Sequence, residues 1–238
     1  MADIWKAWGV SVMGGGHIKE KLPNQDSWLS RTYGDGVVLA VSDGLGSKAL
    51  SDKGSKAACE AVIEAAMIIM RHPRAGVKTL PALIHALWLI KTEPLLPGDC
   101  GATCLFAFTL GKKIILGRLG DGMILAVGKE APVLLEDDKD FANLTDCLDD
   151  AFYYNKWEIK EINARDYEAV IMCTDGVADD IDPDKKTDFA RELFMEYRNM
   201  ERRERHEDIS KWLAEWGGPG NLDDKTLACL CREGLRYE

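Results

Sequence analysis

Acidic residues in this chain recur where an apolar segment stops at a glycine. Asp43, Asp121 and Asp175 each precede a Gly, and the segments VVLAVS and AVIMCT run directly into Asp43 and Asp175. Two further positions place acids just before expected strands, Asp26 early in the chain and Asp223-Asp224 near its end. A carboxylate at the end of a buried strand is anchored by the core, yet it can still reach solvent or an ion. A following glycine lets another group approach the backbone closely.

These acids form an oxygen-only set of possible ligands, with no His or Cys clustered beside them. Oxygen ligands suit Mg²⁺ or Mn²⁺, and the carbonyl of Gly44 could join them. Converging carboxylates raise one another's pKa, and bound cations relieve that repulsion. Two such ions about 3.5–4 Å apart can bind a phosphate and activate a water. An Asp-Gly pair also occurs in plain turns, so a structural interpretation of each position stays open.

Composition narrows the class of protein. The chain has 238 residues and 46% hydrophobic residues, which fits one domain over residues 1–238 with a substantial core. Its net charge of −10 argues against nucleic acid as a partner. The seven scattered cysteines form no CxxC pair and indicate reduced thiols. We expect a cytoplasmic protein with no secretory signal and no membrane-spanning segment.

The elements that must position the acids follow from apolar runs and glycine turns. We expect strands over residues 8–13, 27–32, 37–41, 102–110, 113–119, 123–128, 133–135, 157–162, 169–174 and 226–232. Helices are expected over 51–72, 79–91 and 183–216, with a short one over 140–150. The links between the middle strands are so short that these strands must be antiparallel. Two antiparallel sheets stacked face to face, with helices on their outer faces, satisfy this order.

Six short motifs occur in order along the chain: Asn24-Gln25-Asp26, Val41-Ser42-Asp43-Gly44, Gly101-Ala102-Thr103, Leu119-Gly120-Asp121, Cys173-Thr174-Asp175-Gly176 and Asp223-Asp224-Lys225-Thr226. In sequence and in order, they resemble the motifs of the PP2C (PPM) family of metal-dependent serine/threonine protein phosphatases. The opening of the chain is closest to the compact bacterial branch of that family.

The resemblance implies an α+β fold, a four-layer αββα sandwich of two antiparallel sheets flanked by helices, with a binuclear Mn²⁺ or Mg²⁺ centre at one end. Asp43 would bridge the two ions, and the carbonyl of Gly44 would bind one of them. Asp175 and Asp223 would complete the shell of the other ion. Asp26 would act at or just behind the centre. Asp121, together with Asp175, would match the family's third metal site.

The chain departs from the family's pattern at several positions. Leu45 stands where many members carry a His that is their candidate general acid, and His17 is a possible substitute. Lys21 stands where the family has its phosphate-binding Arg, and it lacks the bidentate fork of an Arg. Asp224 replaces a common Asn, so the choice of ligand between Asp223 and Asp224 stays open; we favour Asp223.

The resemblance implies a phosphatase that hydrolyses phosphoserine or phosphothreonine in proteins by direct attack of a metal-activated water. Its partners would be a phosphorylated protein substrate and a cognate Ser/Thr kinase, and we expect a monomer. The alternative is a degenerate relative that binds a phosphoprotein or a kinase without turnover. A haloacid-dehalogenase-type enzyme is disfavoured, because Asp182-Pro-Asp184-Lys-Lys does not fit the required DxDx[TV] after a first strand.

Overall fold

Two antiparallel sheets form the middle of the molecule. The computed structural model describes residues 4–136 and 145–233. Each sheet has five strands within these residues. The first sheet has the order β1 (Trp5–Val12), β10 (Lys225–Arg232), β9 (Tyr167–Cys173), β6 (Met123–Gly128) and β7 (Val133–Leu135). The second has the order β2 (Ser27–Tyr33), β3 (Gly36–Ser42), β4 (Cys104–Leu110), β5 (Lys113–Leu119) and β8 (Glu158–Asn163).

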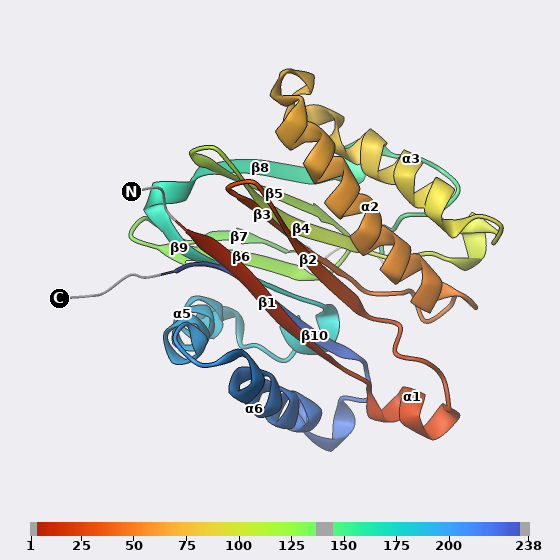
Figure 1. The fold of residues 1–238 in the computed structure, drawn as a ribbon. Coiled ribbons are helices and arrows are strands. Elements are labelled where there is room, and N and C mark those ends of the chain that lie inside the picture. Colours follow the sequence, from red (N-terminus) through yellow and green to blue (C-terminus); the bar gives the residue numbers. More distant parts are fainter. Residues whose placement is uncertain (1–3, 137–144, 234–238) are drawn as a thin grey trace.

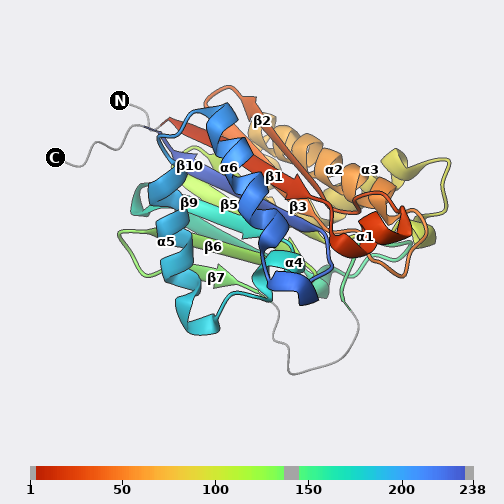
Figure 2. The same cartoon turned by 90° about the horizontal axis from the view of Figure 1, so that it is seen from below.

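The helices cover the outer faces of the two sheets (Figure 1). Helix α2 (Ser51–Arg71) packs on β2, β3 and β4, and α3 (Leu80–Thr92) packs beside it. On the other side, α5 (Lys186–Tyr197) and α6 (Arg202–Glu215) run across the first sheet (Figure 2). Two short helices, α1 (Gly15–Glu20) and α4 (Asp175–Ala178), lie at one end of the sheets. The predicted four-layer αββα sandwich is confirmed.

Three layers of apolar side chains hold the four layers of structure together. The layer between the sheets contains Leu39, Leu105, Ile124 and Met172, all fully or almost fully buried. The outer layers fill the spaces under α2 and α3 and under α5 and α6. Strands that face a sheet on one side and helices on the other are buried on both faces, which explains their continuous apolar runs. Six of the seven cysteines are buried, and all seven are free thiols that form no disulfide bond.

Two local expectations differ from the structure. The helix expected over 183–216 is divided into α5 and α6, with a break at residues 198–201. The short helix expected over 140–150 lies partly outside the described residues, and residues 145–150 are not helical. Within the described part of the chain, no helix has the length and apolar content needed to cross a membrane.

Candidate metal centre

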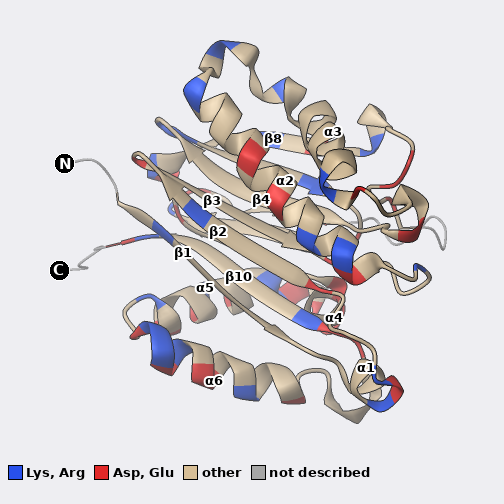
Figure 3. Ribbon diagram, turned by 45° about the vertical axis from the view of Figure 1, so that its right-hand side comes forward, with Lys and Arg blue, Asp and Glu red and all other residues tan. Residues whose placement is uncertain are grey.

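The strand register brings the ends of distant strands together at one end of the sandwich. Strands β2 and β3 pair Ser27 with Ser42, so Asp26 and Asp43 flank the same end of this hairpin. In the other sheet, Cys173 at the end of β9 pairs with both Leu227 and Met123. Asp175, Asp223 and Asp121 therefore sit near these paired ends. Figure 3 shows the acidic residues gathered around α4.

Three carboxyl groups converge at this end. One carboxylate oxygen from each of Asp43, Asp121 and Asp175 lies within 4.8 Å of the others. The backbone of Asp43 is fixed by Thr103, whose hydroxyl accepts from the Asp43 N–H at 2.9 Å and whose N–H donates to the Asp43 carbonyl at 2.8 Å. Thr145 donates its hydroxyl to Asp121 Oδ2 at 2.7 Å. Three carboxyl groups that converge in this way form an oxygen-rich arrangement of the kind that divalent cations prefer.

Asp26 lies behind this cluster and is only 5% exposed. Its Oδ2 accepts a hydrogen bond from the Thr174 hydroxyl at 2.8 Å, while its Oδ1 is buried without a hydrogen-bond partner. Asp121 Oδ1 is also buried without a partner. Buried polar atoms are normally satisfied, so two orphaned carboxylate oxygens in one cluster indicate a place for a cation.

Burial and mutual repulsion raise the pKa values of these acids. Burial is the main cause that raises the pKa of Asp26 to about 7, and the charge of Asp224 adds to it. Burial and then Asp121 and Asp223 raise the pKa of Asp175 to about 7. The pKa of Asp43 is well above its ordinary value because of burial and the neighbouring Asp26 and Asp175. A divalent cation would offset the cost of ionising several of these groups together.

The two adjacent acids Asp223 and Asp224 point to different surroundings. Asp223 lines an open cavity of about 720 Å³ together with Asp175. Asp224 is 1% exposed, and its carboxylate accepts hydrogen bonds from Gly14 N at 2.7 Å, Gln25 N at 2.6 Å and His17 Nδ1 at 2.8 Å. Asp224 therefore has its oxygen atoms occupied by protein donors, whereas the carboxyl group of Asp223 faces the cavity.

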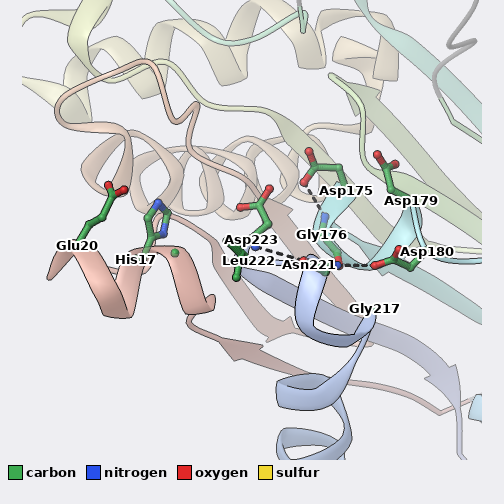
Figure 4. A pocket seen from close by; sticks show the side chains of 12 residues that line it. His17, Glu20, Asp175, Gly176, Asp179, Asp180, Gly217, Asn221, Leu222 and Asp223 are labelled. Carbon is green, nitrogen blue, oxygen red and sulfur yellow. Dashed lines mark hydrogen bonds between the residues drawn. The ribbon is translucent and has the colours of Figure 1, made fainter.

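Figure 4 shows the cavity from close by, with Asp175 and Asp223 on one side and His17 and Glu20 on α1. Sequence reasoning missed Asp179 and Asp180, although they follow Asp175 by about one helical turn. The residues that line the cavity are Gly16, His17, Glu20, Asp175, Gly176, Asp179, Asp180, Gly217, Gly220, Asn221, Leu222 and Asp223.

Gly44 and Gly176 are required by close backbone approaches. A Cβ on Gly44 would lie 2.6 Å from the carbonyl oxygen of Ser51, and one on Gly176 would lie 2.1 Å from that of Asp224. These contacts keep the two Asp-Gly turns tight against neighbouring segments. They explain why glycine follows the acid at both strand ends.

Lys21 stands apart from the cavity lining. It is exposed, and it ends α1 with a left-handed backbone at φ 58°. Leu45 is half-buried, and its N–H donates to the carbonyl of Gly101 at 3.0 Å. Among the positions considered from the sequence for the reaction itself, the described structure thus brings His17, and not Lys21, to the cavity.

Solved structures with the same architecture define the class of fold. The serine/threonine phosphatase Stp1 from Staphylococcus aureus superposes with a TM-score of 0.65 at 12% identity, covering 98% of this chain and 97% of that one. The catalytic domain of the serine threonine protein phosphatase PstP, in complex with two manganese ions, gives 0.66 at 17% identity, with 98% and 100% covered. RsbX in complex with magnesium gives 0.59 at 15%, with 98% of each chain covered.

A comparison of the sequence alone with models of protein families leads to the same class of protein. The family model described as "Protein phosphatase 2C" matches residues 13–216. This chain therefore belongs to the protein phosphatase 2C family, as the six motifs predicted. None of the curated proteins matches the sequence.

Proposed function

We propose that this protein is a metal-dependent phosphatase that hydrolyses phosphoserine and phosphothreonine in proteins. The observation that carries the proposal is the convergence of Asp43, Asp121 and Asp175 beside two orphaned buried carboxylate oxygens, at the edge of an open cavity. Family membership and the manganese-bound and magnesium-bound relatives support the same chemistry.

Each acid would have a separate task in holding Mn²⁺ or Mg²⁺. Asp43 would bridge two ions, with the Gly44 carbonyl on one of them and Asp175 and Asp223 on the other. Asp121, with Asp175, would hold a third. When bound, the cations would supply the positive charge that binds the phosphate and lowers the pKa of a water.

The remaining candidate residues would position the metal-binding acids, transfer a proton or neutralise charge on the phosphate. Asp26, fixed by the Thr174 hydroxyl, would position the cluster from behind. His17 borders the cavity and is a candidate for proton transfer. Lys21 remains a candidate for contact with the phosphate, as a point charge at the end of α1. A phosphorylated protein as substrate, a cognate Ser/Thr kinase, a monomeric state and a cytoplasmic location remain predictions.

The test is hydrolysis of p-nitrophenyl phosphate and of a phosphothreonine peptide with Mn²⁺, with Mg²⁺ and with chelator. We expect metal-dependent turnover that is lost in Asp43→Asn and Asp175→Asn. Asp184→Asn is the matched control, because Asp184 is exposed and lies outside the cavity lining. Tight Mn²⁺ binding without any turnover would favour the alternative, a catalytically degenerate module that binds a phosphoprotein or a kinase. Equal activity in wild type and both variants would contradict the proposed centre.

A further inference from the structure

Asp224 is a buried carboxylate that accepts three hydrogen bonds from the protein. Its Oδ1 accepts from Gly14 N, and its Oδ2 accepts from Gln25 N and from His17 Nδ1, at distances of 2.6 to 2.8 Å. Three N–H groups thus point at the two oxygens of this one carboxyl group, which accepts from all of them. Of these three donors, the His17 ring is the one that can carry a positive charge.

The backbone around His17 holds its ring in place. Helix α1 is tied to the segment before β10, because Gly16 donates its N–H to the Leu222 carbonyl at 2.9 Å. Leu22 donates its N–H to the carbonyl of His17 at 2.9 Å. The His17 side chain is 18% exposed, so the ring is neither buried in the core nor free in solvent.

The contact with Asp224 decides which ring nitrogen is available. Because Nδ1 donates to the carboxylate, Nε2 is the nitrogen left for another partner. The ring borders the same cavity as Asp175 and Asp223 (Figure 4). Among the described residues that line this cavity, His17 is the one imidazole, and the other titratable groups are carboxylates.

We propose that Asp224 is a positioning residue that holds His17 as the general acid for the leaving group of the phosphoester. This inference rests on the proposed function. A bond forms from a water oxygen to phosphorus while the bond from phosphorus to the seryl or threonyl oxygen breaks. The electron pair of the broken bond stays on the leaving oxygen, which takes the proton from His17 Nε2 and becomes a hydroxyl group. The water gives its proton to solvent, and Nε2 is reprotonated from solvent.

The effect of the leaving group on the rate of the His17 variant distinguishes a role in proton transfer from a structural role. A nitrophenolate leaves well without a proton, whereas phenolate and a threonyl oxygen need one. We expect His17→Ala to lose about 10²-fold in kcat on phenyl phosphate and on a phosphothreonine peptide. On p-nitrophenyl phosphate we expect little loss, and added imidazole should restore part of the lost rate. His206→Ala is the control, because His206 is exposed on α6.

Asp224→Asn should show the same selective loss, to a smaller extent, because the neutral amide no longer fixes the ring. Calorimetric Mn²⁺ titration of His17→Ala should match wild type, which places the loss in proton transfer. Equal losses on both aryl esters, or no loss on phenyl phosphate, would overturn this inference while the phosphatase assignment stands. A wild-type protein that hydrolyses neither ester would overturn the proposed function, and this inference with it.

Discussion

Replacing Asp26 with Asn should stabilise the metal-free protein at pH 8. The folded protein raises the pKa of Asp26 from its ordinary 3.8 to about 7, chiefly through burial, with Asp224 adding to it. The neighbouring Thr226 and Thr174 side chains act in the opposite direction and lower this pKa. Between these two pKa values the folded state binds a proton that the unfolded state does not. The free energy of unfolding therefore falls as pH rises from about 4 to about 7.

The size of the effect follows from the same two values. The interval between 3.8 and about 7 corresponds to about 4 kcal/mol, at about 1.4 kcal/mol per pKa unit. For a chain of 238 residues this is a difference of about 10 °C in the melting temperature. Asn should fit the site, because its oxygen can accept from Thr174 and its amide can donate to the adjacent Asp43 carboxyl group.

The assay is thermal unfolding in chelator at pH values from 4 to 8, for wild type, Asp26→Asn and the exposed control Asp184→Asn. The melting temperature of Asp26→Asn should rise relative to that of wild type as pH rises. The melting temperature of Asp184→Asn should stay equal to that of wild type at each pH. Added Mn²⁺ should stabilise wild type at pH 7.5 and stabilise Asp26→Asn less. If the gap between the variant and wild type is the same at every pH, Asp26 does not titrate as a buried acid and the reasoning fails.

Three further substitutions test packing and the surface. Gly54→Ala places a Cβ 1.6 Å from the Cys100 carbonyl oxygen, so it should lower the free energy of unfolding, measured by chemical denaturation, by about 3 kcal/mol or more. A decrease below about 1 kcal/mol would mean that the backbone around this contact relaxes freely. Gly117→Ala meets the Phe106 ring at 2.1 Å, and Phe106→Leu in the same chain should recover part of the lost stability; strict additivity would contradict the contact. Lys21→Ala should lower kcat/KM on a phosphopeptide by less than about tenfold, because Lys21 is exposed; a larger loss would place its charge at the phosphate.

The fold was predictable because its signals are local. Apolar runs mark the buried strands, and short glycine turns require antiparallel neighbours. The division of the last helical region was not predictable in this way. Arg205, inside a run of mixed charge, is buried against the Trp8 ring and donates to the carbonyls of Tyr197 and Met200 at the end of α5. The mixed charges of residues 201–206 contain no sign of that long-range contact.

The sequence was sufficient to predict which residues form the candidate site. It was not sufficient to predict how their side chains are oriented. The hairpin register that sets Asp26 beside Asp43 follows from the short glycine turn between β2 and β3. The choice between Asp223 and Asp224 depends on Gly14 and Gln25, which lie 210 and 199 residues away in sequence. Only the folded chain reveals that these backbone amides occupy one of the two acids.

The same burial that weakens the metal-free fold makes its cation affinity sensitive to protons. Asp26 and Asp175 have pKa values of about 7, so below neutral pH a cation must displace protons from the site to bind. Burial is the main cause that raises the pKa of Asp26 and of Asp223, and the charge of Asp224 adds to both shifts. Its bond to His17 gives that charge a partner inside the protein. A carboxylate at position 224 can therefore be accommodated beside the centre because Gly14, Gln25 and His17 all donate hydrogen bonds to it.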